Sequence, residues 1–307
     1  MVEVIIEIMD KKDIIYTFKK SYDIAYNNDY FCCVGGSANI YDVKSGELIV
    51  NFKDMKQPNF SDFTSDNRLI VKTAKGYYFI YDLMSQTLIN KLSPPKGVLG
   101  SIAKFAVTPD NKFIIDSAYI FPFSQLMIME IETGKYTLYD LKGAKTCTVL
   151  HNESKSIFYI VTGRNETVSD YATHYEDFYS FAYPYHEFDL QKMPIPRYKN
   201  ISNIDYNLEK FAINGYKDVI SICDVKTGEE EQFCCVKDGV LYHLKWSKNG
   251  KYIVLAESRK IHVYYVETKT RIKTYDVDYG CFAEFYDNDT KLLIGTWEKG
   301  YCIDSVF

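Results

Sequence analysis

Histidine and carboxylate side chains gather in one part of the sequence, where they could serve acid–base chemistry or metal binding. Three of the five histidines lie there, His151, His174 and His186, and His174 stands close to Glu176 and Asp177. A metal site needs ligands that converge within about 2 Å of the ion and an ordered second shell. The spacing from His174 to His186 fits no compact ligand motif. We interpret these histidines as surface residues of a tyrosine-rich segment.

Two further motifs could carry chemistry. Gly35-Gly36-Ser37 could cradle a phosphate, but it leads from one apolar run into another and offers no helix N-terminus, so we expect a short hairpin. Glu229-Glu230-Glu231 places carboxylates beside an apolar run, which is typical of a solvated sheet edge. No Gly-x-Ser-x-Gly motif marks an activated serine. The sequence thus predicts no catalytic residue, no cofactor and no metal.

The composition is that of a globular protein with a sizeable core. Of 307 residues, 47% are hydrophobic and 25% charged, and the net charge is −5. The two signs are mixed along the chain without a basic tail or stripe, so we expect no nucleic-acid partner. Acids within the apolar start of the chain argue against a signal peptide. No run approaches the roughly 20 apolar residues of a membrane helix, so we expect no membrane insertion.

The cysteines indicate a compartment. There are eight, and two adjacent pairs, Cys32-Cys33 and Cys234-Cys235, lie in strand-like runs, where neighbouring side chains point to opposite faces. No Cys-x-x-Cys motif occurs. We expect reduced, mostly buried thiols and a cytoplasmic protein.

The elements that position these residues are read from a turn that occurs seven times. Each copy combines Asn, Asp, Ser, Gly or Lys and is followed at once by an apolar run; the copies are residues 26–30, 64–68, 108–112, 151–156, 206–210, 247–251 and 286–291. Their average interval is about 43 residues. A period in the forties, built from turns and short strands, is typical of a β-propeller.

A second marker divides each repeat into four strands, a to d. It is an apolar or aromatic residue, usually followed by an acid and a polar turn, and it begins at Tyr41, Tyr81, Met129, Phe188, Cys223, Tyr264 and Ile303. The first turn then joins strands a and b, and the second joins strands c and d, where Gly supplies the positive φ of a tight hairpin.

Some of these residues resemble the WD40-repeat family. Thr108-Pro109-Asp110-Asn111-Lys112 is similar to that family's Ser-Pro-Asp-Gly-Lys turn, and Tyr41-Asp42 and Tyr81-Asp82 stand where the family carries Trp-Asp. The resemblance covers essentially the whole chain. There is no Gly-His dipeptide, and neither Trp246 nor Trp297 precedes an Asp, so the family's Trp/Ser/His/Asp network is not assured. The resemblance implies a rigid platform for protein partners.

We therefore predict an all-β fold: a single seven-bladed β-propeller of four-stranded antiparallel blades in one domain, residues 1–307. The predicted blade units are 21–55, 56–95, 96–143, 144–200, 201–239, 240–280, and 281–307 together with 13–18. The last unit contains three strands, and residues 14–18 supply the fourth, so that N- and C-terminal strands share the last blade and close the ring. Residues 2–8 are surplus; they form a hairpin with 14–18, compete with 301–306, or belong to an eighth, split blade.

Two repeats are longer than the others. Between the first turn and the second marker, five repeats have 11 to 13 residues, whereas the third runs from 112 to 129 and the fourth from 156 to 188. We place both insertions between strands b and c. Because b–c and d–a loops share one face of a propeller, they would thicken one side of one rim. The alternatives are a small satellite core, in which the insertions fold back on the sheets, and a disordered loop.

The insertions are rich in Tyr and Phe, which are enriched in interface cores. We predict a partner-binding patch of Tyr119, Phe121, Phe123, Tyr171, His174, Tyr175, Phe178, Tyr179, Tyr183, Tyr185 and His186. The function predicted is a non-enzymatic scaffold that binds one or more proteins, as a monomer or as a subunit of a complex. The alternatives are an enzyme or a small-molecule or metal binder that uses the central channel, and a structural subunit of a larger assembly.

Overall fold

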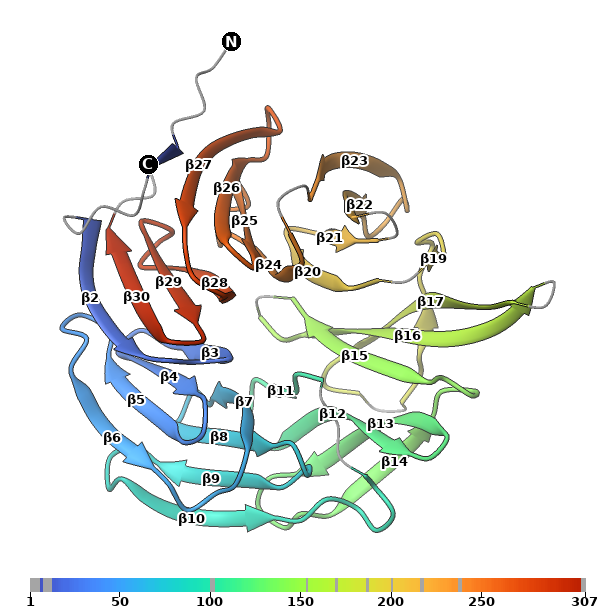
Figure 1. The fold of residues 1–307 in the computed structure, drawn as a ribbon. Coiled ribbons are helices and arrows are strands. Elements are labelled where there is room, and N and C mark those ends of the chain that lie inside the picture. The colour runs from blue at the N-terminus through green and yellow to red at the C-terminus, as the bar shows by residue number, and fades with distance from the viewer. Residues whose placement is uncertain are drawn as a thin grey trace.

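A computed structural model describes residues 6–7, 13–99, 103–152, 154–168, 171–185, 188–199, 201–215, 218–236 and 239–304. These residues form seven antiparallel sheets arranged in a ring (Figure 1). The fold is the predicted seven-bladed β-propeller, because each sheet contains one four-strand unit that passes from strand a at the centre to strand d at the rim.

Every blade is a meander of consecutive strands. Blade 1 consists of β3 (Asp23–Tyr26), β4 (Tyr30–Val34), β5 (Ala38–Asp42) and β6 (Leu48–Phe52). Blade 2 consists of β7 (Pro58–Phe63), β8 (Arg68–Thr73), β9 (Tyr78–Asp82) and β10 (Thr87–Leu92). Blade 3 consists of β11 (Ala106–Val107), β12 (Phe113–Ile120), β13 (Phe123–Glu130) and β14 (Tyr136–Asp140).

The other blades follow the same plan. Blade 4 consists of β15 (Thr146–His151), β16 (Ile157–Val168), β17 (Tyr171–Ala182), β18 (Gln191–Lys192) and β19 (Tyr198–Lys199). Blade 5 consists of β20 (Asn203–Asn207), β21 (Lys210–Asn214), β22 (Val219–Asp224) and β23 (Glu230–Cys235). Blade 6 consists of β24 (Leu241–Trp246), β25 (Tyr252–Glu257), β26 (Lys260–Tyr265) and β27 (Thr270–Asp276).

Blade 7 closes the ring with strands from both ends of the chain. It consists of β28 (Gly280–Tyr286), β29 (Lys291–Thr296), β30 (Lys299–Asp304) and β2 (Ile14–Lys19). Strand β2 is antiparallel to β30, with Lys19 opposite Lys299, so the predicted closure is confirmed. The pairing leaves no open c-strand edge on this blade.

The described part of the surplus N-terminal segment lies in none of the three places considered for it, including an eighth blade. Strand β1 (Ile6–Glu7) lies parallel to β27, with Ile6 opposite Thr274, and thus extends the rim of blade 6. It neither pairs with residues 14–18 nor occupies the place of β30. Residues 2–5 and 8 lie outside the described residues.

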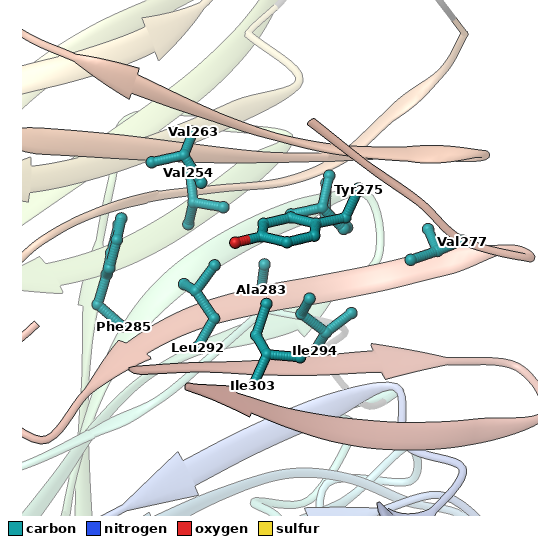
Figure 2. Packing of buried hydrophobic residues seen from close by; sticks show 11 residues of the cluster. Val254, Val263, Tyr275, Val277, Ala283, Phe285, Leu292, Ile294 and Ile303 are labelled. Carbon is teal, nitrogen blue, oxygen red and sulfur yellow. The ribbon is translucent and has the colours of Figure 1, made fainter. Parts of the chain in front are cut away.

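The hydrophobic core is divided into seven clusters, one between each pair of neighbouring blades. Figure 2 shows the cluster between blades 6 and 7, where the ring of Tyr275 packs against Ile294 and Ile303. Tyr275 is 1% exposed, and both isoleucines are fully buried. Aromatic side chains fill such sheet-on-sheet spaces, which accounts for the many Tyr and Phe residues.

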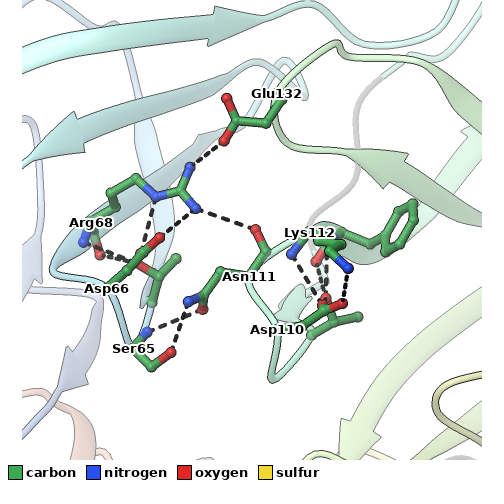
Figure 3. A network of polar contacts seen from close by, with 10 residues as sticks. Ser65, Asp66, Arg68, Asp110, Asn111, Lys112 and Glu132 are labelled. Atoms are coloured by element: carbon green, nitrogen blue, oxygen red, sulfur yellow. Dashed lines mark hydrogen bonds and ion pairs between the residues drawn. The ribbon is translucent and has the colours of Figure 1, made fainter.

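Polar side chains of the a–b turns connect one blade to the next. Between blades 2 and 3, the Asn111 amide donates to Ser65 Oγ at 2.7 Å, and the Arg68 guanidinium donates to the Asn111 carbonyl and to Glu132 (Figure 3). Between blades 6 and 7, Asp289 accepts bonds from the backbone amides of Lys248 and Asn249. The blades are therefore joined by bonds between turns.

Candidate functional site

The strand order divides the propeller into two faces. The a–b and c–d turns lie on one face, called the turn face here, and the b–c hairpins and d–a connections lie on the other, called the loop face. Strands β12 and β13 of blade 3 are eight residues each and are joined only by Phe121 and Pro122. The predicted insertion in blade 3 thus lengthens two paired strands, and its tip stands on the loop face.

The tip of blade 3 exposes apolar side chains. Phe121 is 74% exposed and Phe123 is 42% exposed, while Tyr119 is half-buried. Leu99, which is 68% exposed, lies beside them because its amide donates to the carbonyl of Tyr119. Lys145 donates to the Pro122 carbonyl, and its ammonium group lies 4.6 Å from the centre of the Phe123 ring. Leu99 could not be predicted from the sequence, because this residue lies in an irregular connection outside the repeated turns and strands.

The insertion in blade 4 is a long two-stranded ribbon. Strands β16 and β17 pair over twelve residues each, from Ile157 opposite Ala182 to Val168 opposite Tyr171. Strand β15 pairs with β16 only as far as Gly163, and β19 pairs with β17 at Tyr175 and Glu176. Among the described residues, no strand therefore pairs with the outer part of the ribbon, which projects beyond the ring (Figure 1).

Charged side chains lie where the ribbon leaves the ring. His174 Nε2 is 3.0 Å from Glu176 Oε1, and its Nδ1 is 2.9 Å from Asn165 Oδ1. Burial raises the pKa of Glu176 to about 7 and lowers the pKa of His174. Asp177 receives two bonds of 3.0 Å from Arg197, whose guanidinium also lies 5.4 Å from the Tyr175 ring centre. These contacts fix His174 and Tyr175 at the base of the ribbon.

The boundary assigned to the blade 4 insertion is wrong. The marker at Phe188 does not lie in strand c, because β17 already ends at Ala182 and the chain 183–190 follows it. The Tyr183 amide donates to Ser156 and its hydroxyl donates to Asp110, which belong to the a–b turns of blades 4 and 3. Tyr183 therefore lies on the turn face, opposite to the predicted patch.

The remaining aromatic residues of the insertion pack in the core or against it. Tyr185 packs on Phe181 and Phe188 in the core between blades 3 and 4, beside a cavity of about 490 Å³. Tyr179 is partly buried against the same core. Phe178 is 2% exposed in the core between blades 4 and 5.

The predicted patch thus forms three groups. The loop face carries Tyr119, Phe121, Phe123, Tyr171, His174 and Tyr175; the core holds Phe178, Tyr179 and Tyr185; and the turn face holds Tyr183. His186 lies outside the described residues. The satellite-core alternative fits the second half of the insertion, because those aromatic rings pack on one another.

The central channel is the other candidate site. The first strands of neighbouring blades contact each other all round the ring, from β3 through β7, β11, β15, β20 and β24 to β28. Four of these strands carry an ionisable residue one or two positions before the a–b turn: Asp62, Asp205, Lys245 and Glu284. Because these residues occupy similar places in their repeats, the sequence alone could have indicated a charged channel.

The channel charges pair with one another across the ring. Lys104 Nζ reaches from blade 3 to Asp23 of blade 1 at 2.8 Å and to Glu284 of blade 7 at 4.0 Å. Lys155 of blade 4 lies 3.0 Å from Asp62 of blade 2. The channel is thus cross-linked by ion pairs between blades that are not adjacent.

Neighbouring blades are joined in the same way. Lys245 lies 3.1 Å from Asp205. Burial by itself would lower the pKa of Lys245, but the nearby Asp205 and Glu284 outweigh burial and raise that pKa above its usual value. Burial and the nearby Lys104 lower the pKa of His243 to about 3. His243 is therefore neutral at pH 7.

Metal binding and disulfide formation can also be assessed. Among the described residues, no three His, Cys, Asp or Glu side chains are grouped to hold a metal ion. All eight cysteines are free thiols; five are buried and Cys234, Cys235 and Cys281 are partly buried. No helix in the described part of the chain is long and apolar enough to span a bilayer.

Comparisons with known proteins support the fold. No protein-family model and no curated protein matches the chain. The crystal structure of the C-terminal WD40 domain of Sif2 superposes with a TM-score of 0.69 and 11% sequence identity, covering 98% of this chain and 99% of that domain. The chain thus has a WD40-like propeller fold, as the turn residues implied. Since 1407 solved chains match this fold, it does not by itself select a function.

Proposed function

We infer that this propeller is a non-enzymatic, protein-binding scaffold that binds through the loop face of blades 3 and 4. The observation that carries this inference is the projecting β16–β17 ribbon, whose outer part has two strand edges that pair with no other strand in the described part of the chain. Unpaired edges present rows of backbone donors and acceptors, which bind an extended segment of a partner by strand addition.

The tip of blade 3 belongs to the same surface. Both hairpins are fixed to the 3–4 connection, because Lys145 donates through its backbone to Gly163 and through its side chain to Pro122. Phe121 at the tip of blade 3 and Tyr175 on the ribbon then serve as apolar contact residues, and the outer end of strand pairing in the ribbon includes Tyr171. Tyr and Phe supply contact area with few rotors to order on binding.

The channel is the less favoured location. Its charged side chains satisfy one another across the ring, so a charged ligand would have to break ion pairs such as Lys104–Asp23. Together with the free thiols, the scaffold function fits a cytoplasmic protein that forms part of a complex.

The test is removal of the outer ribbon. Asn165 and His174 are paired opposite each other, so residues 166–173 can be replaced by Asn-Gly, which closes a two-residue hairpin. We expect affinity capture from the host lysate to retain specific proteins with the parent chain and to lose them with the trimmed chain. Met84→Ser, which removes an exposed apolar side chain from the turn face, is the control and should retain them.

Two outcomes would contradict the proposal. One is an identical set of captured proteins with the parent and the trimmed chain. The other is a large loss of thermal stability on trimming, which would make the ribbon a structural element. A ribbon that supports only binding should leave the midpoint of thermal unfolding within about 2 °C.

A further inference from the structure

The lysines of the loop face are concentrated in one sector. The connections and hairpins from the 7–1 junction to the 3–4 junction expose Lys20, Lys53, Lys56, Lys75, Lys96 and Lys142, and Lys145 is partly exposed beside them. Lys104, from the 2–3 connection, points into the channel instead and pairs with Asp23. We call the seven outward lysines the lysine sector. It was not visible in the sequence because its members lie far apart along the chain.

These lysines have no acidic counterpart. Among the described residues, no carboxylate forms an ion pair with any member of the lysine sector. Three lysines on the turn face do pair: Lys112 with Asp110, Lys269 with Glu231, and Lys291 with Asp287. The sector therefore carries an uncompensated positive charge on a protein whose net charge is −5.

The acids of the sector are few and already engaged in local bonds. Asp54 accepts a bond of 2.7 Å from the Tyr81 hydroxyl. Asp140, at the end of β14, accepts from the backbone amide of Lys142. Among the described residues on this side of blades 1 to 3, the seven lysines thus face two exposed acids, because Asp23 is buried and pairs with Lys104.

Exposed apolar side chains stand within the same sector. Tyr22, Leu99 and Phe121 are 50%, 68% and 74% exposed, and the tip that carries Phe121 ends a hairpin of two eight-residue strands. Apolar side chains surrounded by lysines are the combination with which peripheral proteins bind an anionic bilayer. The lysines lie close to the phosphates, and the apolar groups enter the interface.

We propose that the lysine sector docks the propeller on an anionic phospholipid surface, with Phe121 and Leu99 inserted into the headgroup region. The sector is spread over five separate segments of three blades, which suits an extended planar polyanion. Leu99 gains from an acyl environment but cannot stack on a nucleic-acid base. The acidic remainder of the protein would be repelled, so it fixes the orientation with the loop face toward the membrane.

The proposal is tested by sedimentation with vesicles of phosphatidylcholine, with and without phosphatidylserine. We expect binding only when phosphatidylserine is present, and its loss near 1 M salt, where the Debye length falls to about 3 Å. Each lysine near an anionic surface contributes about fivefold to partitioning, so K53E/K56E should weaken binding by at least about 25-fold. F121S should weaken it by about tenfold.

The matched control changes the net charge equally on the other face. Lys44 and Lys135 are exposed in the c–d turns of blades 1 and 3, and K44E/K135E should bind vesicles nearly as the parent does. Circular dichroism of each variant verifies that it is folded. The chain trimmed at 166–173 should also bind vesicles, which separates this proposal from the protein-binding function.

Several results would overturn the proposal. These are the absence of binding to phosphatidylserine vesicles, equal binding by K53E/K56E and the parent, or an unchanged affinity for F121S. Tighter binding to duplex DNA or to polyglutamate than to vesicles would assign the lysines to a nucleic acid or to an acidic protein.

Discussion

The two faces of the propeller use their polar residues in opposite ways. On the turn face, polar side chains bond to the next blade: Asn111 joins Ser65, and Asp289 accepts from two backbone amides of blade 6. On the loop face, lysines such as Lys53 and Lys142 are exposed and form no ion pair among the described residues. The turn-face residues thus join neighbouring blades, whereas these loop-face lysines remain exposed.

This difference follows from the sequence constraints on each face. A hairpin turn that also bonds to its neighbour tolerates few residue types, which is why the turn recurs seven times. The b–c and d–a segments only need to span a gap, so their length and chemistry can vary. The functional residues are therefore expected where the repeat is least regular.

The largest expected effect is a difference in stability between substitutions at two glycines with positive φ, one on each face. A Cβ at Gly46 would lie 2.3 Å from the Tyr16 ring, whereas a Cβ at Gly97 would meet nothing within 4 Å. Both substitutions to Ala carry backbone strain of about 1–2 kcal/mol. Gly46→Ala should lose about 1–3 kcal/mol more, because Tyr16 belongs to the closing strand β2. Urea unfolding measures the difference in unfolding free energy. Equal losses would show that the contact between Gly46 and Tyr16 does not support the closing strand.

A second prediction compares two aspartates. Asp289 is 3% exposed and accepts two backbone bonds, while Asp54 is exposed and accepts one from Tyr81. Asp289→Asn removes one carboxylate acceptor from these two part-buried bonds and should cost about 1–3 kcal/mol. Asp54→Asn should cost less than about 1 kcal/mol. Should Asp54→Asn prove the more destabilising in thermal melts, the structural role of the turn face would be contradicted.

The channel gives a pH prediction. Burial lowers the pKa of His243 to about 3 and that of His151 to about 4, so both favour the neutral form when folded. Their contribution to stability is present above pH 6.5 and is lost as the pH falls toward those values, by about 1.4 kcal/mol per pH unit for each histidine.

His243→Gln removes one of these groups. The slope of the unfolding free energy between pH 6.5 and 4 should therefore be shallower in the variant, by about 1.4 kcal/mol per pH unit. Other titrating groups contribute equally to both proteins. Parallel curves from urea titrations at several pH values would show that His243 is not held neutral in the channel.

The smallest expected effect concerns lysines. Lys291 pairs with Asp287 at 2.9 Å on the turn face, and Lys142 on the loop face has no side-chain ion pair among the described residues. Lys291→Ala should lose less than about 1 kcal/mol, and Lys142→Ala should leave the unfolding midpoint unchanged within about 1 °C. A clear destabilisation by Lys142→Ala would mean that the loop-face lysines stabilise the fold.

The site was less predictable than the fold. The tip at Phe121 and the ribbon with Tyr171, His174 and Tyr175 lie on the expected face, because b and c strands must meet there. Tyr183 and Tyr185 were assigned to the same insertion since Phe188 resembled a c-strand marker, yet strand c ends at Ala182. A marker of two residues cannot distinguish a strand from the loop that follows it.

The sequence by itself determined the number of blades, the four-strand plan and the closure by residues 14–18, because turn chemistry and strand alternation are local and repeat seven times. Only the tertiary structure decided which charges meet. Lys104 reaches Asp23 and Glu284 across the ring, and Lys53, Lys96 and Lys142 share one sector although they lie far apart in the chain. Electrostatic neighbours depend on distance in space, and the ring closes distances that the order of residues does not contain.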